Sequence, residues 1–193
     1  MMIACGLGNP GTEYEHTRHN VGFDVVATVA AFLHVPMRKR FCRPYERGDG
    51  FFSSGTRFVL MRPLTFMNGS GRILKYVQRL LRLPGTDLIV VCDQMDLPCG
   101  SIRIRKGGKD AGHRGLKSII QHYGSEDFIR LYIGVGRPSA GTSVVEHVLS
   151  RPAPDEVPAF QKGIARGADA LAALLAGRPL QEVMNEFNGK IPD

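Results

Sequence analysis

A histidine and an aspartate in separate parts of the chain have the chemistry needed to activate water. His19 lies in the segment Thr17–Asn20, just before a predicted helix, and Asp93 directly follows the apolar run Ile89–Cys92. A carboxylate paired with an imidazole fixes its tautomer and leaves the second ring nitrogen free to take a proton. The chain has no G-x-S-x-G motif. A histidine acting on water therefore fits better than a covalent nucleophile, although a lone histidine is more often a structural or surface residue.

A glycine-rich loop follows the first apolar run. Residues 6–11 read GLGNPG, which matches the G-x-G-x-x-G pattern of dinucleotide-binding loops. A pyrophosphate needs a helix N-terminus directly after the loop, whereas Pro10 and the segment Thr12–Glu15 delay the helix. The acidic residue expected about 20 positions later is also missing, because Ala30–Leu33 lies within a predicted helix. We therefore expect no nucleotide cofactor.

Two further loops carry polar side chains. In the loop at 63–71, Asn68 offers an amide that can pair with a carbonyl or a ribose. The alternative is an ordinary turn in which Ser70 caps the following helix. Residues 105–115 form a basic, glycine-rich loop that enters a helix, and its N–H groups and cations suit phosphates. Its glycine–lysine spacing does not match a Walker loop.

Composition limits the class of protein. The chain of 193 residues is 43% hydrophobic and 22% charged, as in soluble globular proteins. No apolar run approaches the roughly 20 residues of a membrane-spanning helix, and residues 1–5 lack the basic residues of a signal peptide. We therefore predict a soluble, cytoplasmic protein. No two cysteines form a C-x-x-C pair, so we expect four buried packing residues rather than zinc ligands or disulfides: Cys5, Cys42, Cys92 and Cys99.

The net charge of +7 is concentrated in two segments. Residues 103–117 contain six basic residues and one acidic residue, and residues 38–47 contain five basic residues and one acidic residue. A single charge run is commonly a solvated surface. Because the first segment is also rich in glycine, the two together indicate a polyanionic partner.

Strand-like and helix-like segments alternate along the chain. We expect strands at residues 2–7, 51–52, 57–61, 87–92, 101–105 and 128–135, the second and third forming a hairpin. We expect helices at residues 21–33 with Asn20 as cap, 72–83 and 115–122, and two more after the proline-rich segment 152–158. This pattern predicts one α/β domain over 1–193, with three α/β/α layers, a mixed, largely parallel twisted sheet, and C-terminal helices from about residue 155. Ligands of such folds bind beyond the carboxyl ends of strands, where Asn9 and Asp93 lie.

Six segments carry a resemblance to a known family. They read GLGNPG at 6–11, TRHNVGF at 17–23, RPLTFMNGSG at 62–71, DQMDLPCG at 93–100, AGHRGLKSI at 111–119 and RLYIGVGRP at 130–138. In this order and spacing, together with Tyr14, they resemble the bacterial peptidyl-tRNA hydrolases of the monomeric, metal-independent kind over nearly the whole chain.

The resemblance implies hydrolysis of the ester between a nascent peptide and the 3′-terminal ribose of tRNA. By this resemblance, His19 is the general base, Asp93 is its partner, and Asn9 favours an N-blocked peptide over a free aminoacyl group. The positions that contact the end of the substrate are Tyr14, Phe66 and Asn68. The resemblance also implies a monomer, no metal or other cofactor, and the tRNA acceptor stem with its 3′ CCA end as partner. The alternative is a non-catalytic RNA-binding relative, which need not keep the base and its partner.

The chain departs from the family pattern in its basic residues. Arg114 stands where the family has asparagine after the histidine of its GGHNG motif, and Ala111 replaces a glycine. A cation cannot accept a hydrogen bond, so phosphate binding is the alternative role for Arg114. The family also clamps the tRNA 5′-phosphate with two basic residues. Arg105 matches one of them, but the other falls on Tyr132, which leaves three substitutes: Arg130, Lys109 and Arg137.

Overall fold

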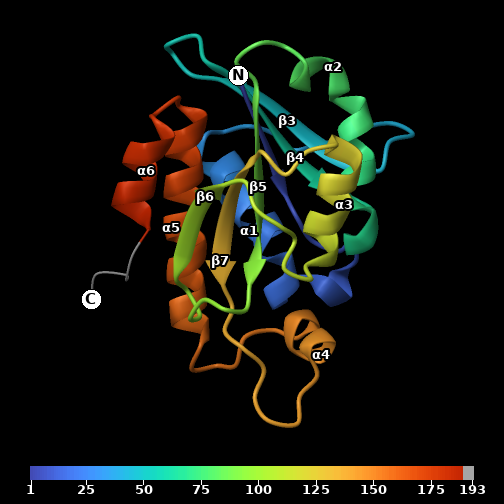
Figure 1. Ribbon diagram of the computed structural model, residues 1–193, viewed down its shortest axis with the longest axis vertical. Helices are drawn as coiled ribbons and strands as arrows, with labels where there is room; N and C mark the ends of the chain where they lie inside the picture. The colour runs from blue at the N-terminus through green and yellow to red at the C-terminus, as the bar shows by residue number, and fades with distance from the viewer. Residues whose placement is uncertain (189–193) are drawn as a thin grey trace.

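The computed structural model describes residues 1–188, in which a seven-stranded sheet lies between two layers of helices (Figure 1). The strand order across the sheet is β2-β3-β4-β1-β5-β7-β6. The strands are β1 (Met2–Gly6), β2 (Arg38–Lys39), β3 (Tyr45–Phe51), β4 (Arg57–Pro63), β5 (Asp87–Gln94), β6 (Ile102–Lys106) and β7 (Ile129–Gly134). The helices are η1 (Thr12–Tyr14), η2 (Arg18–Asn20), α1 (Val21–Phe32), η3 (Met67–Tyr76), α2 (Gln78–Leu81), α3 (Arg114–Tyr123), α4 (Val144–Leu149), α5 (Val157–Leu175) and α6 (Leu180–Phe187).

The centre of the sheet is parallel and its edges are antiparallel. Strand β1 pairs in parallel with β4 and β5, and β5 pairs in parallel with β7. Strand β3 forms an antiparallel hairpin with β4, and β6 runs antiparallel to β7. The central strands are apolar runs buried on both faces, as parallel strands require. The predicted mixed, largely parallel sheet in an α/β/α arrangement is therefore confirmed.

Apolar side chains form one core on each side of the sheet. On one side, α1, α5 and α6 pack on the strands, and Val21, Val25 and Val29 of α1 are almost fully buried there. On the other side, η3 and α3 pack on the strands with Ile73 and Ile119 in the core. Burial of each such side chain stabilises the fold by roughly 1.5–3 kcal/mol. In Figure 1, α4 lies apart from both layers, at the end of the sheet toward which β5 and β7 point.

The helix predicted over 72–83 differs in both its start and its type. It begins at Met67 as a 3-10 helix, and only Gln78–Leu81 is α-helical. Helix α3 packs closely against this segment, because a Cβ on Gly71 would overlap the carbonyl group of Ser118. Ser70 does not cap the helix, because its hydroxyl lies inside the first turn and donates to the Met67 carbonyl.

Two other features differ from the sequence-based expectations. Helix α4 was not predicted; it has six residues and begins with a capping box between Ser143 and Glu146. Cys5 and Cys92 are buried as expected, and burial raises the pKa of Cys5 to about 12. Cys42, however, is exposed, because it follows β2 in a tight loop where its φ is 52°. Among residues 1–188, no helix has the length and apolar character needed to cross a membrane.

Gly22 sets the distance between α1 and the sheet, and its replacement tests this packing. A Cβ there would lie 2.6 Å from the Leu7 carbonyl oxygen and would overlap that of Val91. We expect Gly22→Ala to lower the free energy of unfolding by about 1–3 kcal/mol, the usual cost of overpacking. Urea denaturation measures the change, with Thr28→Ala on the exposed face of α1 as control. A change within about 0.5 kcal/mol, the range of surface substitutions, would show that the contact is not tight.

Candidate active site

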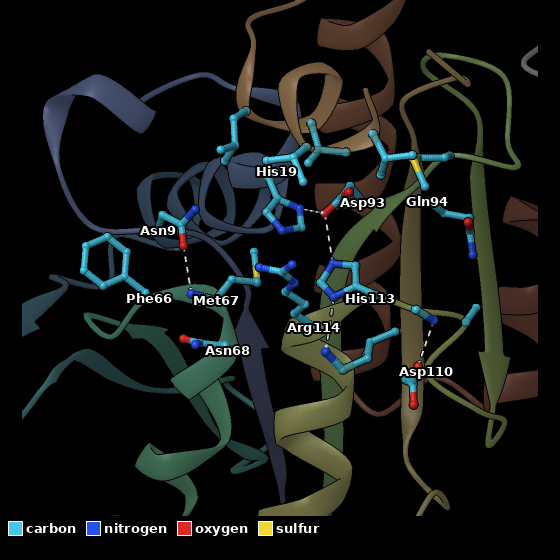
Figure 2. A pocket seen from close by; sticks show the side chains of 18 of the residues that line it. Asn9, His19, Phe66, Met67, Asn68, Asp93, Gln94, Asp110, His113 and Arg114 are labelled. Atoms are coloured by element: carbon cyan, nitrogen blue, oxygen red, sulfur yellow. Dashed lines mark hydrogen bonds and ion pairs between the residues drawn. The ribbon is translucent and has the colours of Figure 1, made fainter. Parts of the chain in front are cut away.

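A cavity of about 320 Å³ opens at the carboxyl ends of β1 and β5, between α4 and the starts of η3 and α3 (Figure 2). Of the eight residues predicted for the site, seven line this cavity. They are Asn9, Tyr14, His19, Phe66, Asn68, Asp93 and Arg114. The eighth, Arg105, is exposed on the edge strand β6 and does not line the cavity. The topology therefore brings together residues that are more than 100 positions apart in the chain.

One oxygen of Asp93 contacts two imidazole rings. Its Oδ1 lies 2.8 Å from His19 Nδ1 and 3.0 Å from His113 Nε2. Asp93 is 4% exposed at the end of β5, and the two ring centroids are 5.0 Å apart. Figure 2 shows both rings turned toward the carboxylate, with a dashed line from each ring to Asp93. The carboxylate therefore holds both histidines in place.

The hydrogen bonds of His113 and the charge of Asp93 determine which nitrogen of each ring carries the proton. His113 precedes α3, and its Nδ1 accepts the backbone N–H groups of Gly115 at 3.1 Å and Leu116 at 3.2 Å. Because Nδ1 accepts, the ring proton is on Nε2 and is donated to Asp93. An ionised carboxylate only accepts, so His19 also donates, from Nδ1. The Nε2 lone pair of His19 is therefore free to take a proton in the cavity.

The same three side chains are close enough together to be considered as metal ligands. Their nearest ligand atoms all lie within 4.8 Å of one another. However, the nitrogens that face Asp93 carry protons in the hydrogen-bonded arrangement, and the other nitrogen of His113 accepts backbone N–H groups. A metal needs the lone pairs of neutral imidazoles. The arrangement is therefore suited to proton transfer rather than to metal binding.

The charge of Asp93 depends on its two partners. Burial alone raises the pKa of the carboxyl group, but the charges and hydrogen bonds of His19 and His113 outweigh burial and hold it well below its usual range. Asp93 therefore stays ionised wherever the protein is folded near neutral pH. It can stabilise an imidazolium on His19 without accepting the proton itself.

His19 is positioned by its neighbour Arg18. This arginine is 5% exposed, and its guanidinium donates to the Ser150 hydroxyl at 2.7 Å and the Arg151 carbonyl at 2.8 Å. It also forms an ion pair with Glu156. Through these contacts, the segment between α4 and α5 holds the turn that contains Arg18 and His19 in place. The position of His19 is therefore fixed relative to the cavity wall that α4 forms.

Asn9 is held by Asn20, which was predicted to cap α1. Asn20 occupies the N-cap position of α1 as predicted, but its side chain does not cap the helix: Oδ1 accepts from Asn9 N at 2.8 Å, and Nδ2 donates to Asn9 O at 2.9 Å. The Asn9 side chain then accepts the backbone N–H of Met67 through Oδ1, at 2.8 Å. Its acceptor is thus occupied, and its Nδ2 donor remains for a ligand.

The other walls of the cavity are aromatic and apolar. Tyr14 and Phe66 meet edge to face with ring centroids 6.3 Å apart, and Phe66 is 59% exposed. Opposite them, α4 presents Val144 and Val145, which are about half exposed. The sequence did not predict this wall, because a helix of six residues is too short to show a clear periodic pattern of apolar residues.

Arg114 is the cation of the cavity. It is the first residue of α3, where the helix dipole disfavours a positive charge. Its side chain is exposed, and it forms no ion pair with a carboxylate in the part of the chain that the structure describes. Figure 2 shows it reaching toward the space between Met67 and His113. An anionic ligand group in the cavity would neutralise this charge.

The structure separates the three proposed substitutes for the missing clamp residue. Arg130 is fully buried, and its guanidinium donates to backbone carbonyls of the loop at 107–110, so it cannot reach a phosphate. Arg137 forms an ion pair with Asp96 at 2.5 Å. Lys109 is exposed and has no carboxylate within 4.0 Å among residues 1–188. Tyr132 is buried, and burial raises its pKa, so its phenol stays neutral.

Comparisons of sequence and of structure with known proteins agree on the family. The family model described as peptidyl-tRNA hydrolase matches residues 3–193. The peptidyl-tRNA hydrolase of Bacillus subtilis (strain 168) is 42% identical over 192 residues, covering 99% of this chain and 100% of the relative. That of Dehalococcoides mccartyi (strain CBDB1) is 42% identical over 191 residues, covering 97% and 100%. The crystal structure of peptidyl-tRNA hydrolase from Acinetobacter baumannii superposes with a TM-score of 0.90 at 30% identity, covering 100% of this chain and 97% of that one.

Because the pKa of Asp93 is lowered, the free energy of unfolding should depend on the charge of this residue at low pH. The pKa of Asp93 in the folded protein lies below its unfolded value of about 3.9. The ionised carboxylate therefore stabilises the folded state above about pH 3.9, and this stabilisation is lost as the pH falls through the folded pKa. We expect Asp93→Asn to make the loss of unfolding free energy between pH 5 and about pH 2 less steep.

Urea denaturation at several pH values tests this expectation, with Asp169→Asn, on the exposed side of α5, as control. The control should keep the pH dependence of the wild type. Parallel curves for the wild type and Asp93→Asn would show that the carboxyl group is not stabilised by its two histidines.

Proposed function

Because this chain belongs to the peptidyl-tRNA hydrolase family, we propose that it hydrolyses the ester between a peptide and the 3′-terminal ribose of tRNA. The observation that carries the mechanism is the free Nε2 of His19, which results from the hydrogen bond between Nδ1 and Asp93. This nitrogen lies in a cavity that also offers the Asn9 amide and the Arg114 cation. The family resemblance predicted from the sequence is confirmed.

The proposed reaction proceeds by general base catalysis. His19 Nε2 takes a proton from a water molecule while the water oxygen attacks the ester carbonyl carbon. The negative charge of Asp93 stabilises the imidazolium that forms. As the tetrahedral intermediate collapses, the bond to the ribose oxygen breaks and the imidazolium returns its proton to that oxygen. The products are a tRNA with a free 3′-terminal ribose and a peptide carboxylic acid, which loses its remaining proton to solvent and leaves as the carboxylate.

The fixed orientation of Asn9 explains a preference for N-blocked substrates. The Met67 N–H on Oδ1 fixes the orientation of the amide, and the Nδ2 group is left as a donor for the substrate. The carbonyl oxygen of a peptide bond accepts such a donor. The α-ammonium of a free aminoacyl group has no lone pair and carries a positive charge, so it gains nothing from this contact.

The remaining residues of the site bind the two ends of the substrate. We assign the exposed face of Phe66, beside Tyr14, to the terminal adenine or the peptide, and the Asn68 amide to a carbonyl or ribose hydroxyl. Arg114 binds a phosphate of the CCA end. On β6, Arg105 with the nearby Lys109 binds the 5′-phosphate of the acceptor stem. We further propose that the enzyme acts as a cytoplasmic monomer that recycles tRNA.

Removal of the base is the first test of this function. We expect His19→Ala to lower the rate of N-acetylaminoacyl-tRNA hydrolysis by about 10²–10⁴-fold, with tRNA binding nearly unchanged. The control is His122→Ala, on the exposed side of α3, which should keep the wild-type rate.

A His19→Ala rate above about a tenth of wild type would remove His19 as general base. A folded wild-type protein that binds tRNA without cleaving it would instead favour the non-catalytic RNA-binding alternative.

Asn9→Asp tests the origin of selectivity. The carboxylate keeps an acceptor for Met67 N and replaces the Nδ2 donor by a negative charge. We expect kcat/KM for N-acetylaminoacyl-tRNA to fall. Selectivity, measured as kcat/KM for N-acetylaminoacyl-tRNA divided by kcat/KM for free aminoacyl-tRNA, should fall by about tenfold, which corresponds to a charge-assisted hydrogen bond of about 1.5 kcal/mol. An equal loss for both substrates would show that Asn9 does not distinguish them.

A further inference from the structure

The two helical layers differ in charge. Helices η3, α2 and α3 contain five basic residues and no acidic residue. Helices α1, α5 and α6 contain two basic and four acidic residues. The basic side also includes a long acid-free segment, because no aspartate or glutamate occurs between Asp49 and Asp87. The layer on the η3 side therefore presents a positive face to solvent.

Four cations form a stripe along η3 and α2 on this face. They are Arg72, Lys75, Arg79 and Arg82. Arg72 and Lys75 are three positions apart on the 3-10 helix η3, and Arg79 and Arg82 are three positions apart on α2 and its C-cap, so each pair projects from one side of its own helix. All four are exposed, and no carboxylate lies within 4.0 Å of any of them in residues 1–188. Like charges at this spacing repel one another by a few tenths of a kcal/mol per pair. A polyanion bound along the stripe would remove this repulsion.

The stripe lies on a helical segment whose first residues line the active-site cavity. Helix η3 begins at Met67, whose N–H binds Asn9, and it leads away from the cavity toward α2. Helix α3 packs beside η3, with a hydrogen bond of 3.0 Å from Gly71 N to the Ser118 hydroxyl. Figure 1 shows α2 and α3 on the same side of the sheet. A molecule whose end occupies the cavity can therefore extend over this layer.

The apolar side chains of η3 and Val77 point inward, and Leu80 and Leu81 of α2 are half-buried against the same core. Ile73, Leu74 and Val77 are buried in the core under the stripe. A helix that binds a membrane needs an exposed apolar face, which the stripe lacks. The ten residue steps from Arg72 to Arg82 extend about 15–20 Å at the rise of 1.5–2.0 Å per residue. This length spans several successive phosphates of a nucleic-acid helix. Such contacts carry no sequence information.

We propose that this stripe binds the phosphate backbone of double-helical RNA, namely the stem of the tRNA whose 3′ end occupies the cavity. The inference rests on the proposed function, and it adds a binding surface outside the active site. Because the stripe contacts only phosphates, it serves tRNAs of any sequence. It contributes to KM and to the salt dependence, and it leaves the chemical step unchanged.

The test compares Arg79→Gln/Arg82→Gln with Lys162→Gln/Arg178→Gln, which removes two cations from the opposite layer. The substrates are N-acetylaminoacyl-tRNA and the same ester on a CCA trinucleotide, which has no stem. For the tRNA, we expect KM to rise about tenfold, kcat to stay unchanged, and the slope of log kcat/KM against log salt to fall by about 1.4–1.8. The trinucleotide, the control pair and Arg79→Lys/Arg82→Lys should all match wild type.

An unchanged KM for tRNA in the double glutamine variant, or an equal loss for both substrates, would overturn the stripe as an RNA-binding surface. So would an equal effect in the control pair. Failure of the wild type to cleave either substrate would instead overturn the proposed function, so the two failures are distinguishable.

Discussion

The active site depends on one carboxylate oxygen that accepts two imidazole N–H groups. Asp93 Oδ1 is the shared partner of His19 and His113, and the N–H groups at the start of α3 fix the outer nitrogen of His113. The N–H groups at the start of α3 therefore fix the tautomer of His113, and the ionised carboxylate of Asp93 fixes the tautomer of His19. A buried carboxylate without these donors would be costly, and the free nitrogen of His19 would not be defined.

The sheet brings this arrangement together from distant segments. Strand β1 leads to Asn9, β5 ends at Asp93, and the loop before α3 supplies His113. Because β1 and β5 are parallel neighbours, their carboxyl ends open at the same edge. Arg18 adds a link to the segment after α4, so the apolar wall of the cavity is attached to the turn that contains His19.

Much of the fold and most of the site follow from the sequence, because the central strands are continuous apolar runs that end in polar loops. His19, Asp93 and Asn9 could be predicted in this way and by resemblance to the family. The contribution of His113 could not, because it depends on a tertiary contact with Asp93. Local propensity suggests that Asn20 caps a helix, but tertiary structure uses both ends of its amide to hold Asn9.

The tautomers of the two histidines test the central claim most directly. Nitrogen-15 NMR of the wild-type protein, with His19→Ala and His113→Ala for assignment, reports which ring nitrogen carries the proton in each neutral imidazole. The structure predicts the proton on Nδ1 in His19 and on Nε2 in His113. A proton on Nε2 of neutral His19 would contradict the account, because that nitrogen could not then take a proton from water.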